Sequence, residues 1–449
     1  MAFQKPQNFV VIFVDDMGYG DLSCYGNTRY KTPNLDRMAA NGAKFTNFYV
    51  GSPACSPSRA SLLTGCYPTR VSVPQVLGPD WKTGLNPDET TIPRMLKASG
   101  YATACVGKWH LGVKNLMPTH QGFDEFFGLP YSADMWPLNG NWPRLFLYEG
   151  DKPLEEIKNL DDQAQLTRRY TEHAQEFIRK NKKKPFFLYM THSMPHVPIA
   201  ASKRFLGKSG AGLYGDVVQE IDWSVGEVLK TLKEQGLEKN TLVTFSSDNG
   251  PWLPYGDHAG SAGGLREGKG TTFEGGFREP GIFYEPGFIP KGLVVNEMAS
   301  TMDYLPTFAK LSGATLPKNE IDGHDICDLI TGKKGAKTPW DAFYYYWPGE
   351  LQAVRSGDWK LHVPHNHRHQ TYPAGTGGKP AGEVTEHIGL SLFNITKDPA
   401  ETTNVADQHP EIVERLLKLI EEARQDFGDT LTKRVGSKVR PPGKVDPTG

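Results

Sequence analysis

Polar side chains that suit metal, anion or proton chemistry directly follow several apolar runs of this chain. One run is followed by Asp15-Asp16 and another by Asp248-Asn249. Carboxylate and amide oxygens are the ligands that Ca²⁺ and Mg²⁺ prefer, and three acidic side chains meeting without a cation would repel one another. The alternative reading is that these residues only end strands, and that the second pair begins a turn.

Basic and histidine side chains follow two further apolar runs. Lys108 and His110 lie two residues apart, so an extended backbone places both on one face. Such a pair is suited to holding an anion and moving a proton. His192 and His196 follow the other run. A histidine taken singly is more often structural than catalytic, so these assignments depend on the four strand ends coming together.

The segment from Cys55 to Gly65 reads Cys-Ser-Pro-Ser-Arg-Ala-Ser-Leu-Leu-Thr-Gly. Pro57 suits a first helical turn, which places Cys55 at a helix N-terminus, where backbone N–H groups favour an anion. Arg59 adds a permanent positive charge. Two alternatives are a buried structural cysteine and a plain reactive thiolate.

The elements that must position these residues follow an α/β pattern. Apolar runs alternate with amphipathic stretches, as in a parallel sheet with crossover helices. Ligands of open α/β sheets bind outside the carboxyl ends of the strands, so the four polar groups are predicted to form one site. The predicted strands span residues 8–14, 101–106, 185–190 and 241–246, and the predicted helices span 33–41, 58–63, 91–99, 163–180 and 214–235.

The last third of the chain has a different character. Short aromatic-rich runs precede an amphipathic segment at 411–427, which predicts a small antiparallel sheet with one helix. We therefore predict a catalytic domain at 1–330 and a smaller α+β domain at 331–449. Residues 364–382 are expected to form a loop, and residues from Gly428 onward a tail.

Composition excludes several classes of partner. The formal net charge is -1, which gives no reason to expect nucleic acid or an anionic membrane surface. No stretch approaches the roughly 18 apolar residues of a membrane span. The five cysteines form no paired Cys-x-x-Cys site. We expect a periplasmic or secreted protein if a signal peptide was removed before residue 1, and a cytoplasmic one otherwise.

The Cys55–Gly65 segment resembles the signature of the formylglycine-dependent type I sulfatases. The similarity extends, in the family's order, over most of the larger predicted domain, and the run 266–280 resembles the arylsulfatase A and N-acetylgalactosamine-6-sulfatase branch. It implies an alkaline-phosphatase-like fold, a large mixed sheet sandwiched by helices. The further matching motifs are Asp15-Asp16, Gly107-Lys108-Trp109-His110, Pro195-His196-Val197-Pro198, Asp248-Asn249-Gly250, the segment 268–276 and the segment 392–404.

The resemblance also implies a metal and a modified residue. In the family the cysteine, here Cys55, is oxidised to Cα-formylglycine, which requires a formylglycine-generating enzyme as a maturation partner. The cation is usually Ca²⁺, with Mg²⁺ as the alternative. By the resemblance it is bound by Asp15, Asp16, Asp248, Asn249 and the modified cysteine.

The same resemblance assigns catalytic roles. One hydroxyl of the hydrated aldehyde would attack sulfur, while Arg59, Lys108 and Lys269 hold the sulfate oxygens. His196 and Lys269 would assist the departing alkoxide. His110 would then take the proton from the second hydroxyl, which expels sulfate and restores the aldehyde.

The implied activity is hydrolysis of a sulfate monoester on a sulfated small molecule or glycan, with a carbohydrate sulfate of the 6-sulfated galactose or N-acetylgalactosamine type favoured. His196 is preferred over His192 as the acid because its Pro-His-x-Pro frame matches the family, and His192 is kept as a weaker substrate-binding candidate. The alternatives are a phosphodiesterase or phosphonate monoester hydrolase of the same superfamily, and an inactive protein that binds sulfated glycans. Specificity is expected from residues 71–81, 131–142, 251–264 and 364–382, with Trp81, Trp136, Trp142 and Trp252 as candidates for stacking on a sugar ring.

Overall fold

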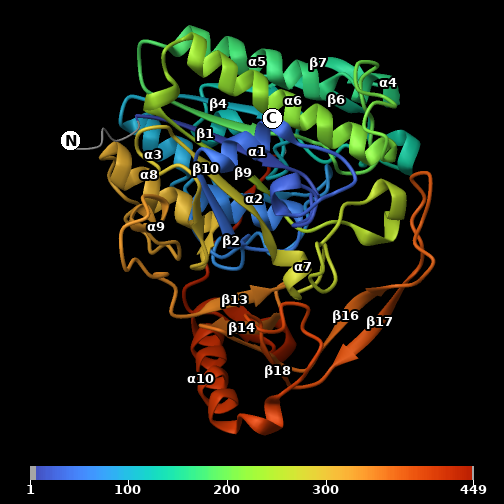
Figure 1. Cartoon of the computed structure of the whole chain (residues 1–449), viewed down its shortest axis with the longest axis vertical. Helices are drawn as coiled ribbons and strands as arrows, with labels where there is room; N and C mark the ends of the chain where they lie inside the picture. The colour runs from blue at the N-terminus through green and yellow to red at the C-terminus, as the bar shows by residue number, and fades with distance from the viewer. Residues whose placement is uncertain (1–6, 447–449) are drawn as a thin grey trace.

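A large mixed β-sheet forms the centre of the protein (Figure 1), whose computed structural model describes residues 7–446. Its strands are β1 (Asn8–Val14), β2 (Ala43–Tyr49), β4 (Ala102–Gly107), β5 (Glu125–Gly128), β6 (Leu145–Glu149), β7 (Lys152–Ile157), β8 (Phe186–Thr191), β9 (Thr241–Ser247), β10 (Arg278–Tyr284), β11 (Leu293–Val295) and β12 (Ala299–Ser300). Within the described residues the order is β11-β2-β10-β9-β1-β8-β4-β5-β6-β7, with β12 paired to β2. The strands from β9 to β5 in this order run parallel, and β10, β6 and β7 run antiparallel to their neighbours.

Helices cover both faces of this sheet, which confirms the predicted α/β class. Side chains of β1 alternate between two cores, so that Val10 and Ile12 pack in one and Phe9 and Val11 in the other. The first core lies under α1 (Pro33–Ala40), α5 (Leu166–Asn181) and α6 (Gly212–Glu234), and the short α4 (Leu160–Gln163) precedes α5. The second lies under α2 (Cys55–Thr64), α3 (Ile92–Ala98), α8 (Tyr304–Ser312) and α9 (Cys327–Ile330), and the short α7 (Glu274–Phe277) precedes β10.

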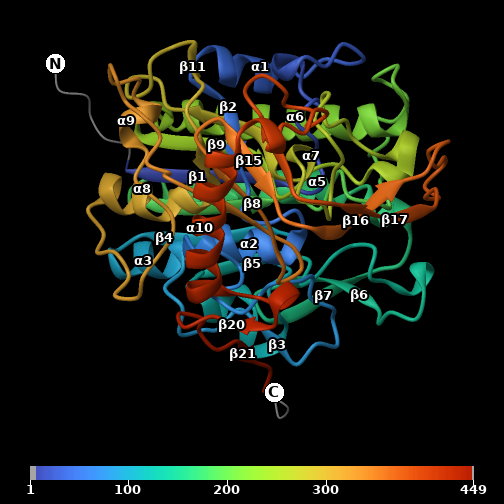
Figure 2. The same cartoon turned by 90° about the horizontal axis from the view of Figure 1, so that it is seen from below.

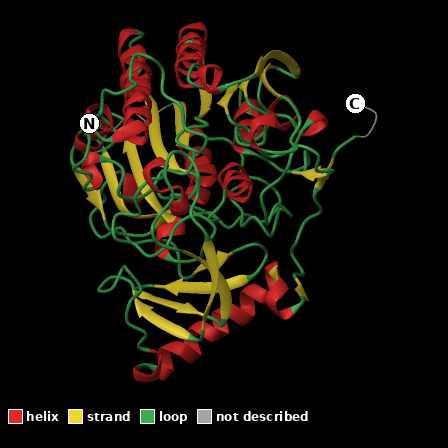
Figure 3. Ribbon diagram, turned by 90° about the vertical axis from the view of Figure 1, so that its right-hand side faces the viewer, coloured by secondary structure: helices red, strands yellow, loops and turns green. Residues whose placement is uncertain are grey.

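A smaller antiparallel sheet with one long helix lies below the large sheet (Figures 1 and 3), as the sequence predicts. The helix packs against β14 and β15 and stands in the foreground when the molecule is seen from below (Figure 2). The elements are β13 (Phe343–Tyr346), β14 (Leu351–Ser356), β15 (Trp359–His362), β18 (Ser391–Asn394) and α10 (Pro410–Phe427). Strands β16 (His365–Gln370) and β17 (Glu383–Ile388) pair to form a separate hairpin.

The prediction of a loop at 364–382 is wrong over its first part, because residues 365–370 form β16. Its histidines alternate, and His365 and His367 are buried while Asn366 is exposed. The ring of His367 packs edge-on against Phe273 at 4.8 Å between ring centroids. The rings of these buried histidines pack like apolar side chains, so a polar composition conceals a strand.

The predicted tail is also wrong for the described residues up to 446. Two short strands, β19 (Gly428–Asp429) and β20 (Arg434–Val435), pair after α10. Further on, β21 (Gly443–Lys444) pairs with β3 (Thr83–Gly84) of the larger unit. Between them Arg440 bonds to Glu89, at 2.7 Å from Nε to Oε1. The last segment therefore fastens the C-terminal unit to the first hundred residues.

Two negative findings apply to residues 7–446. Cys24, Cys55, Cys66 and Cys105 form no disulfide among these residues. No helix is long and apolar enough to cross a bilayer.

A buried ionic cluster joins the two units. The Lys360 ammonium lies 3.0 Å from Glu274 Oε1 and 2.9 Å from Glu401 Oε1, and all three side chains are fully buried. Glu401 Oε2 also accepts the backbone N–H of Glu274 at 2.7 Å. Glu274 begins α7, so this cluster fixes the segment just before it, which carries Lys269.

Replacing Lys360 by methionine should destabilise the protein by about 3–5 kcal/mol, because it leaves two buried carboxylates without their cation. Thermal and urea unfolding would measure the change. Lys418→Met is the matched control, since Lys418 and its partner Glu414 are exposed and should contribute less than about 1 kcal/mol. Equal effects of the two substitutions would contradict the assigned role.

Candidate active site

Four adjacent parallel strands bring the predicted polar groups to one edge of the large sheet. In the order β9-β1-β8-β4, each strand runs into one of the polar segments singled out from the sequence. Backbone bonds tie these segments together: Asp15 N–H donates to Met194 O at 3.2 Å, and Lys108 N–H to Thr191 O at 2.7 Å. Side chains far apart in sequence therefore share one buried site.

Three carboxylates and an amide form its floor. Asp15, Asp16 and Asp248 are buried, and the Asp16 N–H donates to Asp248 Oδ1 at 3.2 Å. Asn249 Nδ2 donates to Asp16 Oδ1 at 2.7 Å. Asp16 has a φ of 64°, in the left-handed region that aspartate tolerates better than most residues. The turn after β1 thus holds two consecutive carboxylates in one place.

This floor fits a divalent cation. Asn249 Oδ1 is buried and has no hydrogen-bond partner within residues 7–446, although buried amide oxygens are nearly always bonded. Burial, reinforced by the charge of Asp15, raises the pKa of Asp248 to about 7, so a cation bound beside it would favour its ionised form. One ligand atom from each of four residues lies within 4.8 Å of the others, and these residues are Asp15, Asp16, Cys55 and His196.

Cys55 is the first residue of α2 and is 2% exposed. Its Sγ lies 3.5 Å from Asp15 Oδ1. Burial raises the pKa of the Cys55 thiol, and the charges of Lys108 and Lys269 do not reverse this. The unmodified side chain is thus a protonated thiol at neutral pH, which argues against a plain thiolate nucleophile.

Three cationic side chains each pair with one carboxylate of the floor. The pairs are Arg59 Nη2–Asp248 Oδ2 at 2.7 Å, Lys108 Nζ–Asp15 Oδ2 at 2.6 Å and Lys269 Nζ–Asp16 Oδ1 at 2.7 Å. Burial opposes a charged lysine, yet Asp15 holds the pKa of Lys108 above its ordinary value. The three formal positive charges equal the three negative ones, so an added divalent cation would leave the site strongly attractive to an anion.

His110 presents an unprotonated Nδ1. Its Nε2 lies 2.7 Å from Leu77 O, and a carbonyl only accepts, so Nε2 carries the proton. Nδ1 is buried without a partner in the described chain. Burial, followed by Lys108 and Arg59, holds the pKa of His110 well below its ordinary value. The ring is therefore neutral at pH 7 and can accept a proton.

The two other candidate histidines differ in their surroundings. His196 Nδ1 lies 2.5 Å from Val197 O, which leaves Nε2 facing Asp16 Oδ2 at 3.5 Å. His192 instead packs between β8 and α6, where its Nε2 lies 3.2 Å from Ser224 Oγ. Burial lowers the pKa of His192 to about 4. The structure thus places His196 in the site and His192 in the adjoining core.

A cavity of about 270 Å³ opens above Cys55. Each segment expected to set specificity contributes to its wall: Val76 from 71–81, Met135 from 131–142, Trp252 from 251–264 and Arg368 from 364–382. The other lining residues are Ala54, Cys55, His110, Ser132, Asp134, His196, Lys269 and Trp347.

The four tryptophans proposed to stack on a sugar ring lie in different surroundings. Trp252 lines the cavity, with its ring 4.5 Å from Lys269 Nζ. Trp81 and Trp142 are each 38% exposed and both border Gly78. Trp136 is 3% exposed and belongs to the core, so it is not available for stacking on a ligand.

Sequence reasoning did not single out several residues of the site: Ser132, Asp134 and Arg368 lie inside segments expected to set specificity, and Trp347 lies outside them. Ser132 Oγ accepts a hydrogen bond from Lys108 Nζ at 3.1 Å. Ser132 and Asp134 follow β5, a fifth parallel strand whose short apolar run is the signal that could have located them. Trp347 and Arg368 come from the C-terminal unit, whose docking onto the large sheet no local pattern shows.

Comparisons with known proteins agree with this geometry. The family model described as Sulfatase matches residues 7–314, and that of the C-terminal region of aryl-sulfatase matches residues 338–442. The chain belongs to the sulfatase family. It is therefore a sulfuric ester hydrolase with the alkaline-phosphatase-like fold that the motifs imply.

Relatives of known activity resemble this sulfatase over nearly its whole length. Human arylsulfatase A is 38% identical, covering 97% of this chain and 92% of its own. N-acetylgalactosamine-6-sulfatase of Mus musculus is 37% identical, covering 94% and 87%. The crystal structure of PsFucS1 sulfatase from Pseudoalteromonas sp. superposes with a TM-score of 0.86 at 29% identity, covering 98% of this chain and 92% of its own.

His110 should be neutral at pH 7, with its proton on Nε2, because Leu77 O accepts that proton and nearby cations disfavour a second one. Nitrogen-15 NMR of the histidine-labelled sulfatase would show the tautomer, with His110→Ala assigning the signal. An imidazolium signal at pH 7, or a proton on Nδ1, would contradict the assignment.

Proposed function

We propose that this sulfatase hydrolyses a carbohydrate sulfate ester by using formylglycine made from Cys55, beside a bound Ca²⁺. The position of Cys55 carries the proposal: it begins α2 next to three carboxylates and three cations, beneath a cavity. The buried thiol is a poor nucleophile as it stands, since its pKa is raised. Formylglycine would supply a hydroxyl nucleophile through its hydrate, which the thiol cannot.

The oxygen-rich floor supports the choice of cation. Asp15, Asp16, Asp248 and Asn249, with the modified Cys55, would hold Ca²⁺, and Mg²⁺ is the alternative. The cation would polarise the sulfate and relieve the repulsion among the carboxylates. The free Oδ1 of Asn249 is the observation that favours a ligand role for this residue.

The cationic side chains would bind the sulfate group. Arg59, Lys108 and Lys269 surround Cys55 and offer N–H donors where negative charge develops during transfer. All three are fixed by carboxylates, so little reorganisation is needed when substrate enters. Ser132 holds Lys108 in place through its hydroxyl.

Two histidines would move protons. His110 would act as a base through the free Nδ1, because its Nε2 is bonded to Leu77 O. His196 would donate from Nε2 to the departing alkoxide as an imidazolium, because Val197 O holds the proton on Nδ1 and the donated proton must be a second one on Nε2. Lys269, beside Asp16, would stabilise the same leaving oxygen by its charge.

A carbohydrate is favoured as the substrate. Trp81 and Trp142 lie half-buried near Gly78, on the segments that supply Val76 and Met135 to the cavity wall, and aromatic rings of this kind stack on sugars. The similarity to N-acetylgalactosamine-6-sulfatase supports a 6-sulfated galactose or N-acetylgalactosamine ester.

Co-expression with a formylglycine-generating enzyme should yield sulfate release in proportion to aldehyde formed at Cys55. Cys55→Ala should lose at least about 1000-fold in kcat/KM, as expected for loss of a covalent nucleophile. Peptide mass spectrometry and turnover of an aryl sulfate and sulfated oligosaccharides would measure both. Full conversion with cleavage of an aryl phosphodiester, and no sulfate release, would overturn the proposal.

Removal of divalent cations with a chelator should abolish turnover, and added Ca²⁺ should restore it. Ca²⁺ at 100 times its Kd should also stabilise the fold by about 2.7 kcal/mol, visible as a rise in Tm. Asn249→Ala should weaken this rise. Unchanged Tm and turnover in chelator would show that no cation is required.

A further inference from the structure

The cavity above Cys55 is small, and its wall is apolar in one part and positively charged in another. Its volume of about 270 Å³ lies at the lower end of the range for small-molecule sites, so it suits one ring-sized group. Val76, Met135, Trp252 and Trp347 make part of the wall apolar, whereas Lys269 and Arg368 bring positive charge. Asp134 also lines this cavity, and it is the acidic side chain there that belongs to neither the floor nor the ion pairs described above.

A carboxylate is unexpected in a cavity that accepts an anion. Burial would raise the pKa of Asp134, but the charges of His196 and Lys108 and a hydrogen bond from Ser132 hold it below its ordinary value. Asp134 is therefore ionised, and an ionised carboxylate only accepts hydrogen bonds. Like charge would make it repel the sulfate group, so its use must lie elsewhere on the substrate.

The hydrogen-bonding capacity of Asp134 is poorly filled by the chain. Its Oδ1 is buried and has no partner within residues 7–446, while a carboxylate offers about four acceptor sites. Leaving such a group unpaired is costly. A donor that arrives with the substrate would supply what the chain does not.

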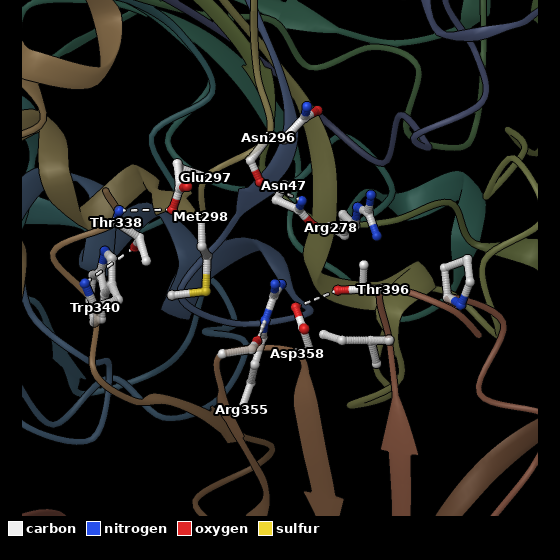
Figure 4. Close-up of a pocket in the computed structure, with 13 residues that line it drawn as sticks. Asn47, Arg278, Asn296, Glu297, Met298, Thr338, Trp340, Arg355, Asp358 and Thr396 are labelled. Atoms are coloured by element: carbon white, nitrogen blue, oxygen red, sulfur yellow. Dashed lines mark hydrogen bonds between the residues drawn. The ribbon is translucent and has the colours of Figure 1, made fainter. Parts of the chain in front are cut away.

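The carboxylates of a second cavity, of about 430 Å³ between the two units, can be compared with Asp134 (Figure 4). Its carboxylates are bonded by the chain: Glu297 Oε2 accepts the Thr338 N–H at 3.0 Å, and Asp358 Oδ1 accepts the Thr396 hydroxyl at 2.7 Å. Asp134 differs from these two acids in having a buried oxygen, Oδ1, without a partner in the described chain.

We propose that Asp134 accepts a hydrogen bond from a hydroxyl or amide N–H close to the sulfate ester, and so selects carbohydrate sulfates over aryl and steroid sulfates. This inference rests on the proposed function. A pyranose carries hydroxyl or acetamido donors on the carbons near its ester, whereas a simple aryl ring or a steroid nucleus carries none there. Asp134 is a specificity-determining residue and takes no part in the chemistry at sulfur.

Asp134→Asn tests the proposal with little change in shape. Steady-state kinetics would compare 4-nitrophenyl sulfate with the best substrate from a panel of galactose, N-acetylgalactosamine and fucose sulfates. We expect kcat/KM to fall about 10- to 100-fold on the sugar sulfate, the effect of losing a charge-assisted bond, and less than threefold on the aryl sulfate. Asp358→Asn, in the other cavity, should change neither.

The wild-type protein supplies an independent measurement if the variant folds poorly. A deoxy analogue that lacks the hydroxyl nearest to the ester, which is the 4-hydroxyl in a 6-sulfated galactose, should be a 10- to 100-fold poorer substrate than its parent, and Asp134→Asn should discriminate far less between the two. Equal losses of Asp134→Asn on sugar and aryl substrates would overturn the proposal, because they would mean that Asp134 acts through His196. Wild-type turnover of aryl sulfate with no sugar sulfate cleaved would also overturn it and leave the sulfatase activity standing. Turnover of neither class, with Cys55 fully converted, would instead refute the proposed function.

Discussion

The balance of charge beneath Cys55 is the constraint on which the rest of the structure depends. Each of the three buried carboxylates has a cationic partner: Asp15 pairs with Lys108, Asp16 with Lys269 and Asp248 with Arg59. Neither set would be stable alone in so buried a place. A divalent cation added to this neutral arrangement would leave excess positive charge beside the nucleophile, which is what binding of an anionic ester requires.

The backbone of the large sheet fixes the positions of most of these charged residues. The carboxylates follow β1 and β9, and Lys108 follows β4, so the hydrogen-bonded register of the sheet fixes their separation. Lys269 lies on an irregular segment, and the buried cluster of Glu274, Lys360 and Glu401 anchors the end of that segment. The same buried cluster therefore stabilises the interface between the two units and fixes the position of Lys269.

Much of this could be predicted from the sequence, because buried parallel strands read as continuous apolar runs and their polar ends stand out. The same logic failed where a run was short, as at β5, which conceals Ser132 and Asp134. It failed again where histidines occupy the buried positions of a strand, as at His365 and His367. Trp347 was missed, and Arg368 was covered only as part of the segment 364–382, since docking between units leaves no periodic signal in either partner.

One part of the cavity wall comes from a different part of the chain than the floor. The groups that would handle sulfate lie on residues 15–269, at the edge of a rigid sheet, whereas Trp347 and Arg368 belong to the C-terminal unit and its hairpin. Substitutions or length changes in the β16–β17 hairpin can therefore reshape what enters without disturbing the strand ends beneath. Such a division lets a lineage acquire new substrates while its reaction stays constant, with the hairpin as the part free to diverge.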